Sequence, residues 1–160
     1  MKGGVNIMII KAGGKSIIEK NHCDYNCRNT IIKILIPHDN YTLTLLRNSN
    51  YVNDLGLISW GDGTSGDLNN LYVHTYNKAG VYTVQGHFTF GLGFEPTRSM
   101  KEVLIEVIRL SNKCTNLSKA FYDCSNLKKI DLNGFDMSKV IDKTDMVKGC
   151  NMLDINSLDI

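Results

Sequence analysis

The sequence predicts a mainly β protein, in which an antiparallel β-sandwich is followed by a short C-terminal solenoid of repeats. Two observations lead to this prediction. Short apolar stretches rich in β-branched residues recur between residues 31 and 110, and turn-forming residues separate them. After residue 110 this alternation ends and a period of 26 residues takes its place. We therefore expect an N-terminal attachment segment (1–30), a sandwich (31–110) and repeats (111–160).

Length and charge exclude several classes of function. A chain of 160 residues holds one ordinary domain, or a small domain with an appendage. Lysine and arginine number 18 against 16 acidic residues, so the net charge of +2 gives no electrostatic case for binding nucleic acid. No apolar run approaches the ~20 residues that span a bilayer. We expect neither nucleic-acid binding nor membrane insertion.

The N-terminal segment carries one short apolar stretch, residues 5–10, between Gly-Gly pairs at 3–4 and 13–14. This arrangement predicts a strand between flexible turns. The stretch is shorter and more polar than the apolar region of ~7–15 residues in a signal peptide. We therefore expect no secretion signal here, and we assign residues 1–30 to attachment within an assembly.

The five cysteines are odd in number and scattered along the chain, which argues against a disulfide framework. Cys23 and Cys27, with His22 beside them, suggest a metal site. A zinc site needs about four ligands, and no second cluster completes this one. Ordinary free thiols are the alternative, and we expect no cofactor.

The expected strands of the sandwich are apolar or alternating runs that stop at turn residues. The first is the strongly β-branched run TIIKILI, which ends at Pro37. The expected strands, in chain order, are residues 30–36, 41–46, 55–60, 71–76, 81–90 and 101–108. Their spacing is typical of an antiparallel sandwich.

The repeats are visible as a match between two segments of the C-terminal part. Residues 118–124 superpose on residues 144–150 at an offset of 26, and the same offset relates Leu127 to Leu153. This period falls in the range of leucine-rich solenoids. Only about one and a half repeats are present, so they must stack on the sandwich or on a partner.

Two segments resemble known families. ISWGDGTS at residues 58–65, followed by VHTYNKAGVYTV at residues 73–84, resembles the polycystic-kidney-disease (PKD) type of immunoglobulin-like domain. Residues 116–153 resemble the leucine-rich repeats of bacterial surface proteins of the BspA type. A PKD-like sandwich followed by such repeats occurs in bacterial surface proteins and in phage proteins. The resemblance implies an immunoglobulin-like fold and a role in display or adhesion.

Asp62, in the Gly-Asp-Gly sequence, is expected to turn the chain. Gly61 and Gly63 permit positive φ, and a short carboxylate accepts bonds from nearby backbone N–H groups. The lone tryptophan, Trp60, would place a large ring in the core just before this turn. Calcium is the alternative, with oxygens from Asp62 and Asp67, although calcium takes about six to eight oxygen ligands.

The histidine of the PKD-like segment is expected to be structural. A catalytic His74 would need a nucleophile and an orienting acid, and the sequence does not supply that set. Cys124 and Cys150 hold equivalent repeat positions and are expected to be core residues. The predicted structural signature comprises Trp60, Gly61, Asp62, Gly63, His74, Tyr76, Gly80, Tyr82, Cys124 and Cys150.

The predicted function is non-enzymatic, with no catalytic residue: a surface-displayed structural or adhesion protein. The candidate ligand contacts are Phe94, Arg98, Tyr122, Lys128 and Asn133, and the alternative for each is an ordinary solvated position. Without an export signal, we expect a phage virion component, a capsid decoration or a tail-associated protein. Its partners would be proteins of the assembly and a glycan or protein of the host surface, and a homo-oligomer stays open.

Two alternatives remain for the function. The first is a cell-surface adhesin of the BspA type, and the second is an accessory carbohydrate-binding module. An enzyme would need convergent titratable groups, but the acidic residues lie scattered on predicted turns.

Overall fold

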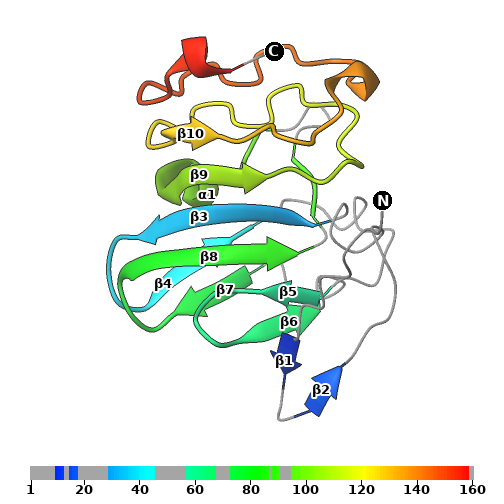
Figure 1. The fold of residues 1–160 in the computed structure, drawn as a ribbon. Helices are drawn as coiled ribbons and strands as arrows, with labels where there is room; N and C mark the ends of the chain where they lie inside the picture. The colour runs from blue at the N-terminus through cyan, green and yellow to red at the C-terminus, as the bar shows by residue number, and fades with distance from the viewer. Residues whose placement is uncertain are drawn as a thin grey trace.

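A computed structural model describes residues 10–12, 15–17, 29–45, 57–67, 73–86, 88–90 and 95–158 of the chain. It confirms that the protein is mainly β (Figure 1). The elements are β1 (Ile10–Ala12), β2 (Lys15–Ile17), β3 (Thr30–Ile36), β4 (Tyr41–Thr44), β5 (Leu57–Ser59), β6 (Ser65–Asp67), β7 (Val73–Tyr76), β8 (Gly80–Gly86), α1 (Arg98–Val103), β9 (Leu104–Arg109), β10 (Lys129–Ile130), and the 3-10 helices η2 (Met137–Lys139) and η3 (Ile155–Ser157).

The strand β3 lies inside a six-stranded sheet with the order β10-β9-β3-β8-β5-β6. It pairs with β8 along its whole length, from Thr30 opposite Gly86 to Ile36 opposite Gly80, and with β9 on its other side. Alternate side chains of β3, those of Ile32, Ile34 and Ile36, are buried. The β-branched run of the sequence therefore becomes a central strand with one face in the core.

A second sheet, formed by β4 and β7, lies behind β3 and β8 (Figure 1). Its inward side chains Tyr41, Leu43 and Tyr76 are buried in one cluster with the apolar side chains of the large sheet. Burial on both inner faces supplies the main stabilising term, since each fully buried large apolar side chain contributes roughly 1.5–3 kcal/mol.

The large sheet is mixed, which corrects the expectation of an antiparallel sandwich. All strand pairs among β3, β5, β6, β8 and β9 are antiparallel. The added strand β10 pairs with β9 in parallel, with Lys129 opposite Glu106 and Ile130 opposite Val107. A parallel neighbour requires a long crossover, and residues 110–128 provide it.

The prediction of a strand at residues 101–108 was wrong for its first three residues, because residues 98–103 form α1. The hydroxyl of Thr97 caps this helix by accepting a hydrogen bond from the N–H of Met100. Met100 and Val103 are buried, so tertiary packing holds a helix too short to be stable alone. The chain becomes extended at Leu104 and continues as β9.

The hairpin of β5 and β6 closes around the Gly-Asp-Gly turn, and β6 was not expected from the sequence. Ser59 lies opposite Ser65. The expected strand at residues 5–10 overlaps the described chain only at Ile10, which begins β1; residues 5–9 lie outside the described residues. β1 pairs with β2 on either side of the second Gly-Gly pair.

The C-terminal part contains two stacked segments, which we name the inner coil (residues 114–125) and the outer coil (residues 140–151). Four inner N–H groups donate to outer carbonyls: Leu117 to Asp142, Lys119 to Thr144, Phe121 to Met146 and Asp123 to Lys148. Positive φ recurs at the predicted offset, at Lys119 and Asp145 and again at Asp123 and Gly149. Figure 1 shows the C-terminal chain stacked on the β9 side of the large sheet.

The two glycines of the turn make a matched pair for mutagenesis. Gly61 and Gly63 have φ of 86° and 89°, but a Cβ at Gly61 would lie 2.5 Å from the carbonyl oxygen of Thr83, whereas at Gly63 nothing lies within 4 Å. Gly63→Ala should cost about 1 kcal/mol of unfolding free energy for the left-handed backbone alone. Gly61→Ala should cost at least about 2 kcal/mol more, measured by urea unfolding. Equal losses would contradict the close approach.

Candidate functional site

Asp62 binds both to its own turn and to the neighbouring strand β7. Its Oδ1 accepts hydrogen bonds from the N–H and the hydroxyl of Thr64, at 3.0 and 2.6 Å. Its Oδ2 lies 2.7 Å from Nε2 of His74. The carboxylate therefore closes the turn at one oxygen and ties the turn to β7 at the other.

Aromatic rings pack around this contact. The His74 ring stacks on Trp60, with centroids 4.7 Å apart and planes 8° from parallel, and meets Tyr76 edge-on at 4.6 Å. The Tyr76 hydroxyl donates to the carbonyl oxygen of Trp60 at 2.9 Å, and its ring lies 4.5 Å from that of Tyr82. Burial raises the pKa of Tyr76 above its ordinary range. Gly80, another residue of the predicted structural signature, is the first residue of β8.

The pKa of Asp62 is lowered. Partial burial acts to raise this pKa, but the hydrogen bonds from Thr64 and the contact with His74 outweigh burial. A lowered pKa in the folded state means that the carboxylate stabilises the fold at pH values above the ordinary carboxyl pKa of 3.8. That contribution is lost as the pH falls through the folded-state value.

The variant Asp62→Asn tests this linkage. We expect the wild type to be more stable than the variant at neutral pH, by a margin that shrinks as the pH falls below about 4. Urea unfolding of both proteins at a series of pH values between about 7 and 3 measures the margin. A margin that stays constant over this interval would show that the Asp62 charge does not favour the fold.

The structure brings no metal-binding group together in the part of the chain that it describes. Within those residues, no group of three or more His, Cys, Asp or Glu side chains could hold a metal ion. Both oxygens of Asp62 are engaged as above, and the side chain of Asp67 is outside what the structure describes. His22, Cys23 and Cys27 also lie outside the described residues.

The repeat cysteines lie in the core between the coils. Cys124 and Cys150 are 0% and 5% exposed, and burial raises the pKa of their thiols to about 12 and about 11. The Cys150 thiol donates to the carbonyl oxygen of Phe121 at 3.0 Å. Since the thiolate is the reactive form, these thiols are poor nucleophiles.

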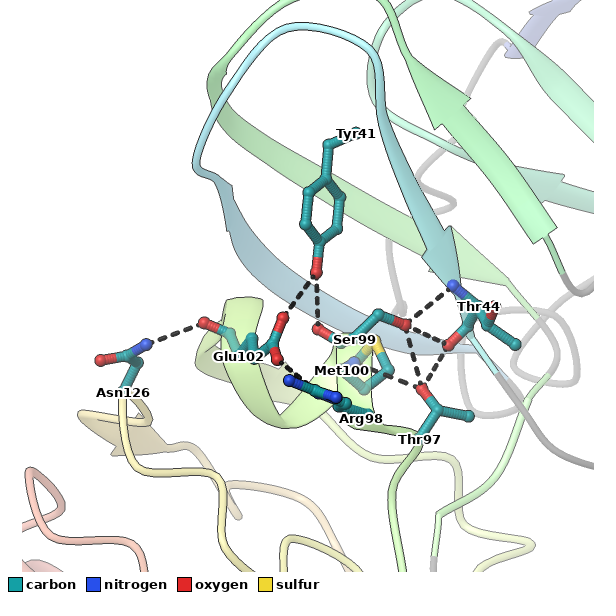
Figure 2. Close-up of polar contacts among 8 residues, drawn as sticks. All are labelled: Tyr41, Thr44, Thr97, Arg98, Ser99, Met100, Glu102 and Asn126. Atoms are coloured by element: carbon teal, nitrogen blue, oxygen red, sulfur yellow. Dashed lines mark hydrogen bonds and ion pairs between the residues drawn. The ribbon is translucent and has the colours of Figure 1, made fainter.

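A polar groove lies between β4 and the start of α1 (Figure 2). It is open and has a volume of about 540 Å³. Its walls carry hydroxyl groups, one carboxylate, one guanidinium and two rings. The lining residues are His38, Tyr41, Thr42, Thr44, Thr97, Arg98, Ser99 and Glu102.

Hydroxyl groups from the helix start close the outer edge of β4. The N–H of Thr44 donates to Oγ of Ser99 at 3.0 Å, and the hydroxyl groups of Ser99 and Thr97 both donate to the Thr44 carbonyl oxygen. Figure 2 shows these contacts converging on one residue of the strand. At Thr44, the edge of β4 that borders the groove is therefore bonded to two side chains and not to another strand.

A carboxylate and a guanidinium form the groove rim. One oxygen of Glu102 accepts from Nε of Arg98 at 3.1 Å, and the other accepts from the Tyr41 hydroxyl at 3.3 Å. The Arg98 side chain is 94% exposed, so it can reach a ligand. Burial, followed by the Glu102 charge, raises the pKa of Tyr41, which keeps its hydroxyl protonated as a donor. Asn126, which directly follows the inner coil, donates to the Glu102 carbonyl oxygen of the helix at 2.8 Å.

Tyr122 lies apart from the groove, among three lysines. The ammonium groups of Lys101, Lys119 and Lys148 are 5.1, 5.7 and 5.7 Å from its ring centroid. These lysines pair with acidic neighbours, among them Glu95 at 2.8 Å from Lys101. The Tyr122 ring is therefore occupied by cation–π contacts of the protein itself.

The other predicted ligand contacts do not gather at one place with Tyr122. Arg98 lies on the groove, whereas Lys128 and Asn133 are exposed positions beside β10. Phe94 lies outside the described residues. Sequence reasoning missed Tyr41, Ser99 and Glu102, and the one local signal for this region was the cap pattern around Thr97.

A scan of protein-family models, a search of curated proteins and a search of solved structures each found no match to this chain. In the described ranges, no helix has the length and apolar character needed to cross a bilayer. The arguments for function therefore rest on the chain itself.

Proposed function

We propose that this protein is a non-enzymatic binding module that works on a surface as a structural or adhesion protein, and that the groove between β4 and α1 binds a glycan. The groove carries the proposal. It presents a carboxylate, a guanidinium and several hydroxyl groups on one open rim, beside the rings of Tyr41 and His38. Concave sites with a few convergent polar groups are where small ligands bind.

The chemistry of the rim favours a saccharide. Sugar hydroxyl groups both donate and accept, so the adjacent Glu102 carboxylate and Arg98 guanidinium can bond to one sugar as acceptor and donor. The rim is polar and half exposed, which suits a hydrated ligand that binds weakly.

The bonding of the polar groups argues against catalysis in the groove. Ser99 is the natural nucleophile, but its hydroxyl donates to the Thr44 carbonyl oxygen, which is not a base. His38 uses Nδ1 toward the carbonyl oxygen of Asp39 at 2.8 Å. Asp62 and His74 are joined to each other on a different part of the fold.

We also propose the finer fold, a PKD-like immunoglobulin-like sandwich followed by leucine-rich repeats. The packing of Trp60, His74 and Tyr76 around the Gly-Asp-Gly turn supports the first part. The stacking of the inner and outer coils at the offset of 26 residues supports the second. The pairing of such parts in phage and bacterial surface proteins places the protein on a virion surface in this proposal, with a bacterial adhesin as the alternative.

Glycan binding is tested on an array of host and bacterial surface polysaccharides, with the protein both monomeric and displayed on a tetravalent carrier. We expect weak binding by the monomer and an increase of about 10²–10⁴ on display, because many weak sites act together. Glu102→Gln should weaken binding about tenfold by removing the charged acceptor. Lys128→Ala, outside the groove, is the matched control. Binding unaffected by Glu102→Gln would remove the groove from the proposal.

The virion location has its own test, a mass-spectrometric inventory of purified phage particles from the source culture. We expect the protein in the particles in many copies. Recovery from the bacterial envelope, with none in the particles, would favour the adhesin. Recovery as free soluble protein alone would contradict both locations and leave glycan binding to be judged separately.

A further inference from the structure

Among the described residues, a row of backbone N–H groups in the outer coil has no backbone acceptor. In the inner coil, every second N–H from Leu117 to Asp123 donates to a carbonyl of the outer coil. The equivalent outer N–H groups, 26 positions later, donate no backbone hydrogen bond among the described residues. They belong to Lys143, Asp145, Val147 and Gly149.

The remaining bonds of the two coils match one another. Ala120 donates to Leu117 in the inner coil, and Met146 donates to Lys143 at the same offset in the outer coil. The carboxamide oxygen of Asn116 accepts from the N–H of Ser118, as the carboxylate of Asp142 does from Thr144. The outer coil therefore repeats the hydrogen-bonded conformation in which the inner coil binds its neighbour.

A second observation concerns side chains in the same part of the chain. At three exposed positions in or just after the inner coil the side chains are polar, whereas their counterparts 26 positions later are apolar. These pairs are Thr115 and Ile141, Asn126 and Met152, and Lys129 and Ile155. Ile141, Met152 and Ile155 are 81%, 53% and 54% exposed. Apolar side chains exposed at positions where the preceding repeat is polar are consistent with burial against a partner.

We propose that the outer coil binds a partner polypeptide, whose segment adds as a third coil in parallel register and offers backbone carbonyls to these four N–H groups. The partner segment carries the same kind of repeat and an apolar side chain to cover Ile141. This inference deepens the proposed role in an assembly and does not depend on the glycan groove.

Neither coil of a second copy of this chain fits the open row. Two outer coils brought face to face would each present N–H donors, and donors cannot bond to donors. The inner coil is already covered by its own chain, since Phe121 packs on Phe90 at 5.2 Å and Lys119 pairs with Glu95 at 3.6 Å. The proposal therefore assigns the acceptors to a different polypeptide.

The test uses amide hydrogen exchange, read by NMR on the full chain. The probe is a synthetic peptide with the sequence of residues 135–160, which carries the outer coil and stands in for the third coil. A fusion of the full chain to a second copy of residues 135–160 keeps the offset of 26 and removes the entropy cost of association. A scrambled extension of the same composition is the control.

We expect fast exchange at Lys143, Asp145, Val147 and Gly149 in the free protein, and exchange at least about tenfold slower in the fusion and with saturating peptide. Ile141→Asp should abolish the effect of the peptide, whereas Val81→Asp, at another exposed apolar residue, on β8, should not. A folded fusion in which the four amides stay unprotected would overturn the proposal.

Protection of the same amides by raising the concentration of the protein alone would also overturn it, in favour of self-association. Failure of the glycan hypothesis is distinguishable, because Glu102→Gln should leave amide protection unchanged and Ile141→Asp should leave glycan binding unchanged.

Discussion

The described structure depends on the backbone pairing of β3. This strand is bonded to β8 on one side and to β9 on the other, and its alternate isoleucines fill the space between the two sheets. The C-terminal part joins the large sheet through the pairing of β10 with β9, which itself pairs with β3, so the position of this join follows from the register of β3. A slip of one residue would turn the isoleucines to solvent, which fixes that register strongly.

Around this frame, the polar and thiol side chains that could carry out chemistry instead fix the conformation of the backbone or pack in the core. Asp62 closes a turn, Thr97 caps a helix, Asn116 and Asp142 hold the starts of the two coils, and the thiols of the repeats pack between them. Short polar side chains do this well, because they reach only their own or neighbouring backbone groups. On the groove rim, the paired side chains of Arg98 and Glu102 stay exposed to solvent, so a ligand can reach them.

Local patterns in the sequence were sufficient to predict β3, the Gly-Asp-Gly turn and the period of 26 residues. The helix α1 escaped prediction because KEVLIEVI alternates like a strand, and the cap at Thr97 with burial of Met100 decides the helix through contacts distant in sequence. The parallel join of β9 and β10 depends on a crossover whose path no local pattern encodes. The groove combines Tyr41 with Ser99 and Glu102, residues nearly 60 positions apart, so only the folded chain brings them together.

The blocked edge of β4 affects how neighbouring copies of the protein can interact when they are close together. A strand at the margin of a small sheet is a template on which another chain can add, and this leads to aggregation. At Thr44 the hydroxyl groups of Thr97 and Ser99 already bond to the backbone N–H and carbonyl groups that an added strand would need. If many copies of the protein lie close together, this blocked edge opposes the pairing of β4 with a strand of a neighbouring copy. The groove beside it stays open to solvent.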